Sequence, residues 1–139
     1  MKIENGKWKI SGPAVGYLND MSMDNIIEEK SYQFAVRIVK LCGILEKEKK
    51  QYVLSKQLLK SGTSIGANIA ESQQAQSRKD FVSKINIALK EATETKYWLR
   101  LLHDTGFLSD IEFDSIFNDA VEIEKIIVAI VKTSKIDLE

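Results

Sequence analysis

The residues that could do chemistry in this chain are few. Its 139 residues include one cysteine, Cys42, and one histidine, His103. A zinc site needs three or four His, Cys or carboxylate ligands, and a di-iron helical bundle needs two Glu-x-x-His pairs, so this supply is too small for either. The sequence also contains no Gly-rich phosphate loop and no Gly-x-Ser-x-Gly turn. We therefore predict no catalytic residue, no metal, no cofactor and no enzyme activity.

The remaining polar groups have structural interpretations. Cys42 lies among apolar residues, with no second cysteine or histidine in its segment to activate it, and we expect an inert core thiol. His103 falls in the last turn of a predicted helix, where an imidazolium interacts favourably with the helix dipole. Glu91 and Glu94 are one turn apart, but the lysines beside them favour a solvated charged face. None of these groups predicts a reaction.

Basic side chains give the chain a candidate nucleic-acid surface. Those that could neutralise phosphates are Lys47, Lys49, Lys50, Lys56, Lys60, Arg78, Lys79 and Lys84. However, twenty basic residues are balanced by twenty acidic ones, and the sequence pI is about 6.6, well below the value typical of dedicated nucleic-acid binders. RNA or DNA is therefore the alternative partner, and a ring that repeats the patch around an axis would strengthen it.

Charge is distributed unevenly along the chain. Residues 24–103 carry fourteen basic and nine acidic groups, whereas residues 104–139 carry three basic and nine acidic groups. Unlike surfaces on one protomer can meet head to tail, and such a contact closes into a ring when the rotation allows it. The charge pattern therefore predicts a cyclic homo-oligomer.

Hydrophobic periodicity predicts four helices. They span about 24–49, about 52–72, a segment that opens at Ser77 and ends at Gly106, and a segment that opens at Ser109 and runs to about 132. The third has the clearest seam, which consists of Phe81, Ile85, Ala88, Ala92, Thr95, Leu99 and Leu102. Short connections between long helices make neighbours antiparallel. We predict an all-α fold, an up-down-up-down four-helix bundle over residues 24–139.

Residues 1–23 differ in composition from the rest and form a predicted N-terminal extension. Asn5-Gly6 favours a type I′ turn between residues 2–4 and 7–9, which would place Ile3 opposite Trp8 in a β-hairpin. Three interpretations stay open for this segment: a hairpin docked on the bundle, a flexible extension, or a misplaced start of the sequence upstream of a native first residue at Met23.

The predicted second helix is rich in small residues. The residues that distinguish it are Gly62, Ser64, Gly66, Asn68 and Glu71. Glycine in a helix interior costs up to about 1 kcal/mol relative to alanine, so the two glycines indicate close packing of a neighbouring backbone. Asn68 falls near the core stripe, and we expect its amide to fix the register between two helices.

Apolar residues exceed what a monomeric bundle needs. Ile87, Trp98 and Leu101 lie about 110° around the third helix from its seam. The run 126–131, which includes Ile126 and Val128, is apolar around the whole helix. Such surface predicts self-association, unless the N-terminal segment covers it. The run has six residues where a membrane span needs roughly 20, so we expect no membrane segment. The single cysteine favours a cytoplasmic location.

Several stretches carry a resemblance. The segments 31–36 and 54–71, the latter ending in Ser-Ile-Gly-Ala-Asn-Ile-Ala-Glu, together with 79–81 and 101–108, resemble the four-helix-bundle proteins encoded in 23S ribosomal RNA intervening sequences. The resemblance covers about residues 25–134. It implies a bacterial four-helix bundle that forms homopentamers. It also implies a relation in fold to the accessory protein of diversity-generating retroelements, which binds nucleic acid and a reverse transcriptase.

Two functions follow from these patterns. The first is a non-enzymatic homo-oligomeric scaffold that recruits a protein partner such as a reverse transcriptase. The second is an assembly that associates with RNA or DNA through the basic patch. The response of binding to salt separates them, because release of counterions from nucleic acid makes binding weaken steeply as salt rises.

Overall fold

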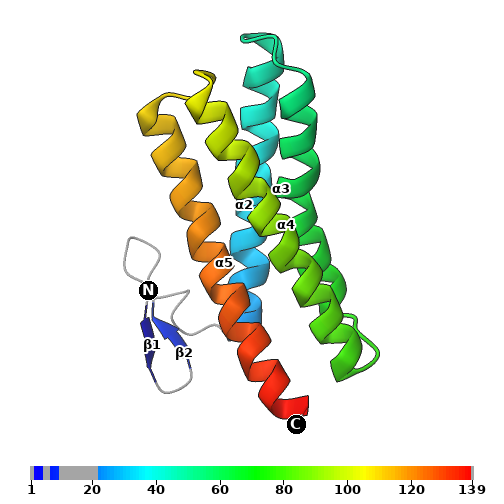
Figure 1. Cartoon of the computed structure of the whole chain (residues 1–139). Coiled ribbons are helices and arrows are strands. Elements are labelled where there is room, and N and C mark those ends of the chain that lie inside the picture. The colour runs from blue at the N-terminus through cyan, green and yellow to red at the C-terminus, as the bar shows by residue number, and fades with distance from the viewer. Residues whose placement is uncertain (1, 5–6, 10–21, 139) are drawn as a thin grey trace.

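The described residues include four long antiparallel helices. The computed structural model describes residues 2–4, 7–9 and 22–138, with side chains described from 22 to 134. The helices are α2 (Met23–Lys47), α3 (Val53–Ser72), α4 (Arg78–Asp104) and α5 (Asp110–Leu138), and they run alternately up and down (Figure 1). The predicted all-α four-helix bundle is therefore confirmed. No helix in the described part of the chain is long and apolar enough to cross a membrane.

The predicted helix ends are close to the observed ones except at the C-terminus. α5 continues to Leu138, past the predicted end near residue 132. The reason is that neither glycine nor proline follows Gly106, so no residue interrupts the helix.

Local capping defines where the last two helices begin. The Ser77 hydroxyl accepts a hydrogen bond from the Asp80 amide at 3.0 Å at the start of α4. At the start of α5, the predicted first residue Ser109 forms a reciprocal capping box with Glu112: the Ser109 hydroxyl accepts from the Glu112 amide at 3.1 Å, and the Glu112 carboxylate accepts from the Ser109 amide at 2.9 Å. The Ser109 amide and hydroxyl lower the pKa of Glu112.

Gly106 ends α4 as the sequence predicts. Its φ of +87° is a left-handed conformation that glycine adopts without strain. The Phe107 amide donates to the Leu102 carbonyl at 2.8 Å and the Gly106 amide donates to the His103 carbonyl at 3.1 Å. These two bonds form a Schellman motif and satisfy carbonyls that the end of the helix leaves without partners.

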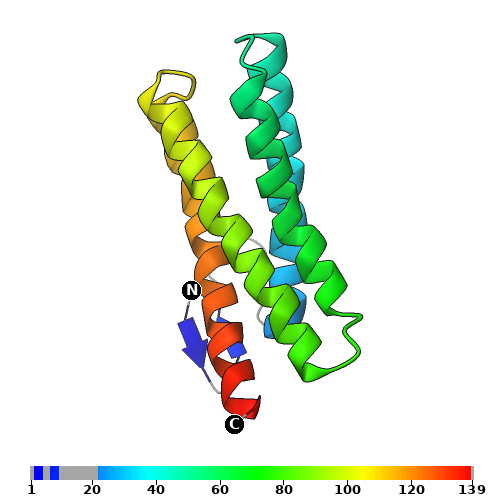
Figure 2. The ribbon, with the colours of Figure 1, turned by 45° about the vertical axis from the view of Figure 1, so that its right-hand side comes forward.

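The helices follow one another around the bundle in chain order. Extensive contacts join α2 to α3, α3 to α4 and α4 to α5, and less extensive ones join α5 to α2. Helices α2 and α4 are therefore diagonally opposed, α4 in front and α2 behind in Figure 1. Figure 2 shows the pair α4 and α5 inclined to the pair α2 and α3, and the two pairs diverge toward the end that carries the α2–α3 and α4–α5 loops.

One core runs the length of the bundle. All predicted seam residues of α4 are buried except Phe81, which is half-buried while its neighbour Val82 takes the core position. Phe81 lies in the first turn of α4, where its ring packs under the Arg78 guanidinium, 5.7 Å from the ring centroid. The buried Thr95 hydroxyl donates to the Ser61 hydroxyl at 3.0 Å, so α3 and α4 share a satisfied polar contact within the core.

Small residues bring α2 and α3 together, as predicted. A Cβ built on Gly62 would lie 2.9 Å from two side-chain carbons of Ile38, and one built on Gly66 would lie 3.2 Å from the Ser31 backbone oxygen. Neither position has room for a side chain without movement of α2. The two glycines therefore set the distance between these helices.

The N-terminal hairpin has the predicted register. Strands β1 (Lys2–Glu4) and β2 (Lys7–Lys9) pair antiparallel, with Ile3 opposite Trp8. Most of the predicted extension, including residues 10–21, lies outside the described residues, so the three interpretations of the segment stay open.

Candidate interaction surfaces

An apolar strip lies on the outer face of α4. Ile87 and Tyr97 are exposed there, Tyr97 by 58%, and Trp98 and Leu101 are half-buried. The Tyr97 and Trp98 rings meet edge to face with centroids 5.1 Å apart, and the Trp98 indole N–H donates to Glu94 at 3.2 Å. We call Ile87, Tyr97, Trp98 and Leu101 the α4 strip. Three of its members are residues for which the sequence predicted an interface, and Tyr97 is an addition.

A second apolar strip lies on the outer face of α2. Tyr32 and Val39 are 63% and 53% exposed, and Val36 between them is half-buried. Beside Tyr32, a groove of about 400 Å³ runs between α2 and α3, with a floor of small residues such as Gly66 and Ala67. We call Tyr32, Val36 and Val39 the α2 strip. The interface predicted from the sequence does not include this strip, although its spacing of four and three residues is a helical signal.

The apolar run in α5 is explained within one chain, which corrects the prediction of an interface there. Ile126 is 0% exposed, and Ile127, Ile130 and Val131 are also buried. Val128 is half-buried. Because α5 packs against both α4 and α2, two of its faces are covered inside the bundle. Ile126 therefore has no surface to offer to a second copy in this conformation.

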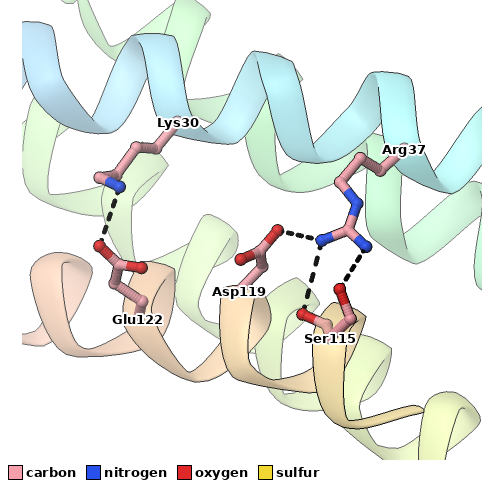
Figure 3. A network of polar contacts seen from close by, with 5 residues as sticks. All are labelled: Lys30, Arg37, Ser115, Asp119 and Glu122. Carbon is pink, nitrogen blue, oxygen red and sulfur yellow. Dashed lines mark hydrogen bonds and ion pairs between the residues drawn. The ribbon is translucent and has the colours of Figure 1, made fainter. Parts of the chain in front are cut away.

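The acidic charge of α5 is also partly used within one chain. Lys30 of α2 pairs with Glu122 at 2.8 Å, and Arg37 of α2 pairs with Asp119 (Figure 3). The Arg37 guanidinium also donates to the Ser115 hydroxyl at 2.9 Å (Figure 3). These contacts weaken the argument that unlike charges join copies head to tail, because the basic partners of α5 lie on its own neighbours.

On the other side of α5, Lys96 of α4 pairs with Glu124 at 2.8 Å. Both side chains are mostly buried, whereas the pairs between α5 and α2 are more exposed. The acidic residues of α5 thus have basic partners on both neighbouring helices. Contacts within one chain therefore account for part of the charge asymmetry of the sequence.

The structure divides the predicted basic patch between the two ends of the bundle. Lys47, Lys49, Lys50 and Lys56 lie at the α2–α3 loop, whereas Arg78, Lys79 and Lys84 lie at the start of α4. Helix α3, with 20 residues, separates the two groups by about 30 Å at 1.5 Å per residue. The single patch predicted from the sequence is therefore wrong, and each end has to be considered by itself.

At the α4 end, the cations have partners. The Lys84 ammonium pairs with the Glu71 carboxylate at 2.9 Å, and this hydrogen bond raises the pKa of Lys84. Arg78 packs over Phe81. This end offers little free positive charge beyond Lys79.

At the α2–α3 loop, an exposed aromatic residue lies among the cations. Tyr52 immediately precedes α3 and is 51% exposed. Lys47, Lys50 and Lys56 are exposed around this loop, and none forms an ion pair with another described residue. Lys49 differs, because its ammonium donates to the Phe107 carbonyl at 2.7 Å and so bridges the two loops at this end. We call Lys47, Lys50, Tyr52 and Lys56 the α2–α3 corner.

The other signature residues of α3 are structural. Asn68 is half-buried and donates to the Ser64 carbonyl of its own helix at 2.8 Å, so the predicted contact between helices is wrong. The Ser64 hydroxyl also bonds within the helix, to the Lys60 carbonyl at 2.6 Å. Glu71 forms the ion pair to α4 with Lys84. Of the predicted set, the glycines therefore determine the packing of α2 on α3, and Glu71 joins α3 to α4.

The candidate chemical groups are dispersed. Cys42 is buried, its thiol donates to the Ser55 carbonyl at 3.4 Å, and burial raises its pKa. Burial and the nearby Glu94 raise the pKa of Glu91. In the described part of the chain, no group of three His, Cys, Asp or Glu side chains could hold a metal ion.

His103 lies at the α4–α5 corner. Its Nε2 is 2.7 Å from an Asp110 oxygen, and its ring stacks on Phe113 with centroids 4.3 Å apart. The hydrogen bond to Asp110 is the main cause that raises the pKa of His103. His103 therefore links the end of α4 to the start of α5, in keeping with the structural role predicted for it.

The sequence and the fold of this chain are similar to those of known proteins. Residues 23–129 match the family model of the 23S rRNA-intervening sequence protein. A crystal structure of a protein with unknown function from the S23 ribosomal protein family of Bacteroides thetaiotaomicron is similar, with 55% identity and a TM-score of 0.78. The match covers 79% of this chain and 98% of the other. No curated protein matches the sequence.

Proposed function

We propose that this chain, which belongs to the 23S rRNA-intervening sequence protein family, is a non-enzymatic homo-oligomeric scaffold that recruits a protein partner. The observation that supports this proposal is the pair of apolar strips on diagonally opposed helices. Exposed aromatic and aliphatic side chains gathered on one face are typical of interaction surfaces. The scaffold functions in the cytoplasm, where the lone thiol of Cys42 stays reduced.

The two strips favour contact between unlike faces. The α2 strip and the α4 strip differ in sequence and lie on opposite sides of the bundle. When the α2 strip of one copy packs on the α4 strip of the next, an open row of copies retains one free strip at each end until it closes. A closed ring leaves neither strip in water, and five copies are the number that the family resemblance implies. The helix faces outside the ring contacts are then available to a partner such as a reverse transcriptase.

Substitutions on the two strips test this arrangement. Val39→Glu and Tyr97→Glu each put a charge within one strip while leaving the core intact, because both side chains are at least half exposed. Loss of a residue that anchors an interface costs about 2 kcal/mol or more, roughly a 30-fold loss in affinity. Ile111→Glu is the matched control, since Ile111 is 83% exposed and outside both strips.

Light scattering coupled to size exclusion then gives the outcome. The wild type and the Ile111→Glu variant should elute as a multiple of 15.7 kDa, and each strip variant should elute as a single chain. An equimolar mixture of the two strip variants should form a dimer of one copy of each, because one intact α2 strip meets one intact α4 strip. A wild-type particle of 15.7 kDa at micromolar concentration would refute the scaffold.

The α2–α3 corner favours the alternative function, association with RNA or DNA. Its lysines have no ion-pair partners within the described chain and lie within five residues of an exposed tyrosine, and single-strand-binding proteins combine cations with exposed aromatic rings. Salt separates the two functions. Binding to nucleic acid weakens with a slope of about −0.7 to −0.9 per phosphate contact against log salt, whereas an apolar protein contact responds little.

A further inference from the structure

We propose that the α2–α3 corner binds single-stranded nucleic acid, with one base stacked on Tyr52 and adjacent phosphates bound by Lys47, Lys50 and Lys56. The proposal rests on the second of the two functions above and gives it a site. It does not depend on the ring, because all four residues lie within one chain.

The position of Tyr52 leaves its ring available. The residue lies between the loop and the first residue of α3, and half of its surface is exposed. Its neighbour Val53 is also exposed, so the loop presents a small apolar surface at a point where the chain turns. Every base has a π-face, and stacking on an exposed aromatic ring therefore requires no particular sequence.

The cations of the corner are free to contact phosphate. Three lysines, Lys30, Lys84 and Lys96, pair with carboxylates of neighbouring helices. Lys47, Lys50 and Lys56 do not pair with any described residue. Residues 46–60 contain five lysines and two glutamates, a local excess in a chain with no net charge. One of the glutamates, Glu46, is half-buried and accepts from the Ser55 hydroxyl at 3.4 Å.

The backbone at Lys50 supplies an independent argument. Its φ of +56° is the only positive value of a non-glycine residue in the described chain. A left-handed conformation is unfavourable for lysine and is accommodated by glycine without strain. Backbone strain of this kind concentrates at functional sites. Here it occurs where the chain leaves α2, as the next amide, that of Gln51, donates back to the Leu45 carbonyl at 2.9 Å, and a lysine occupies the position.

Carboxylates of the other loop limit the path of the strand. Asp110 and Glu112 begin α5 at the same end of the bundle, and Lys49 is directed toward that loop by its bond to Phe107. Asp110 is bound by His103 and Glu112 by Ser109. The negative loop therefore directs a nucleic-acid strand across the outer side of the α2–α3 corner, over Tyr52 and Lys56.

Fluorescence anisotropy of the full chain with labelled single-stranded oligouridylate tests the proposal, with duplex RNA and single-stranded DNA of the same length as comparisons. Three lysine contacts predict a slope near −2 against log salt. Tyr52→Ala should weaken binding about tenfold or more, and Tyr52→Phe should retain it, because the ring remains available for stacking. Lys50→Gln and Lys56→Gln should each reduce the slope by about 0.7. Lys79→Gln, at the opposite end, is the control and should bind as the wild type does.

Each outcome has a distinct meaning. If the wild type does not change the anisotropy of any probe at low salt, both the site and the second function are refuted. If it binds but Tyr52→Ala binds equally well, or duplex RNA binds as tightly as single strands, binding is electrostatic without base stacking and only the stacking site is refuted. The Val39→Glu variant should bind with unchanged affinity per chain, so failure of the ring leaves this result intact. Melting by circular dichroism verifies that each variant folds.

Discussion

A comparison of two glycines tests how closely α2 and α3 must pack. We expect Gly62→Ala to destabilise the protein, because the new methyl group would lie 2.9 Å from the Cγ1 and Cγ2 atoms of the buried Ile38. Gly43→Ala is the matched control, since Gly43 also lies inside a helix but a Cβ there would meet nothing within 4 Å.

The magnitude follows from two opposed effects. Alanine in place of glycine in a helix interior stabilises by about 0.8–1 kcal/mol, and this gain applies to both variants. Overpacking of a filled core costs typically 1–3 kcal/mol, and this cost applies only to Gly62→Ala. Gly43→Ala should therefore be more stable than the wild type by roughly 1 kcal/mol, and Gly62→Ala should be less stable than Gly43→Ala by about 1–3 kcal/mol.

Urea denaturation at matched protein concentration measures both variants, and the difference corresponds to about 4 °C in melting temperature per kcal/mol for a chain of this size. A double-mutant cycle then combines Gly62→Ala with Ile38→Ala, which removes the two Cγ carbons. The cost of Gly62→Ala should largely disappear in that background, because the clash is gone. If Gly62→Ala stabilises the protein as much as Gly43→Ala does, the inference that Gly62 sets the distance between α2 and α3 is wrong.

The remaining predictions concern the two loops and one ion pair. Lys50→Gly should stabilise the fold by roughly 1 kcal/mol in thermal denaturation, because glycine adopts a φ of +56° without strain; an unchanged melting temperature would contradict the strain. The raised pKa of His103 stabilises the fold fully below the unfolded pKa of about 6.5, and this stability is lost as pH rises through the folded pKa. His103→Gln should flatten that dependence in urea titrations, and a profile that keeps its shape would count against the bond to Asp110. A double-mutant cycle on Arg37 and Asp119, both 42% exposed, should give a coupling of at most about 1 kcal/mol that falls as salt rises, whereas a coupling insensitive to salt would argue against a screened ion pair.

Local signals explain why the fold is predictable from the sequence. The capping residues at Ser77 and Ser109 and the glycine at 106 act through hydrogen bonds to their own neighbours, so their effect does not depend on distant parts of the chain. The α4 seam is equally local, because its spacing alone determines which side chains share a face. Only Phe81 departs from it, at the first turn of the helix.

The interaction surfaces were harder to predict because they depend on which helices are neighbours. Periodicity does not reveal that α5 packs against both α2 and α4. It therefore predicts an interface at Ile126, which the bundle itself buries. The same omission affected Asn68, which lies beside the core stripe but bonds within its own helix. The prediction of a single basic patch is wrong for a related reason. Helix α3 separates the basic residues at its start, such as Lys56, from those that follow its end, such as Arg78.

The α2–α5 contact gives the bundle one side that differs from the other three. It is the least extensive contact between neighbouring helices, and its outer edge carries the bridges of Lys30 and Arg37. Dissolved ions screen such bridges, and less packing remains here than at the other three contacts to hold the helices together. We therefore expect hydrogen exchange to be fastest along the edge where the first and last helices of the bundle meet.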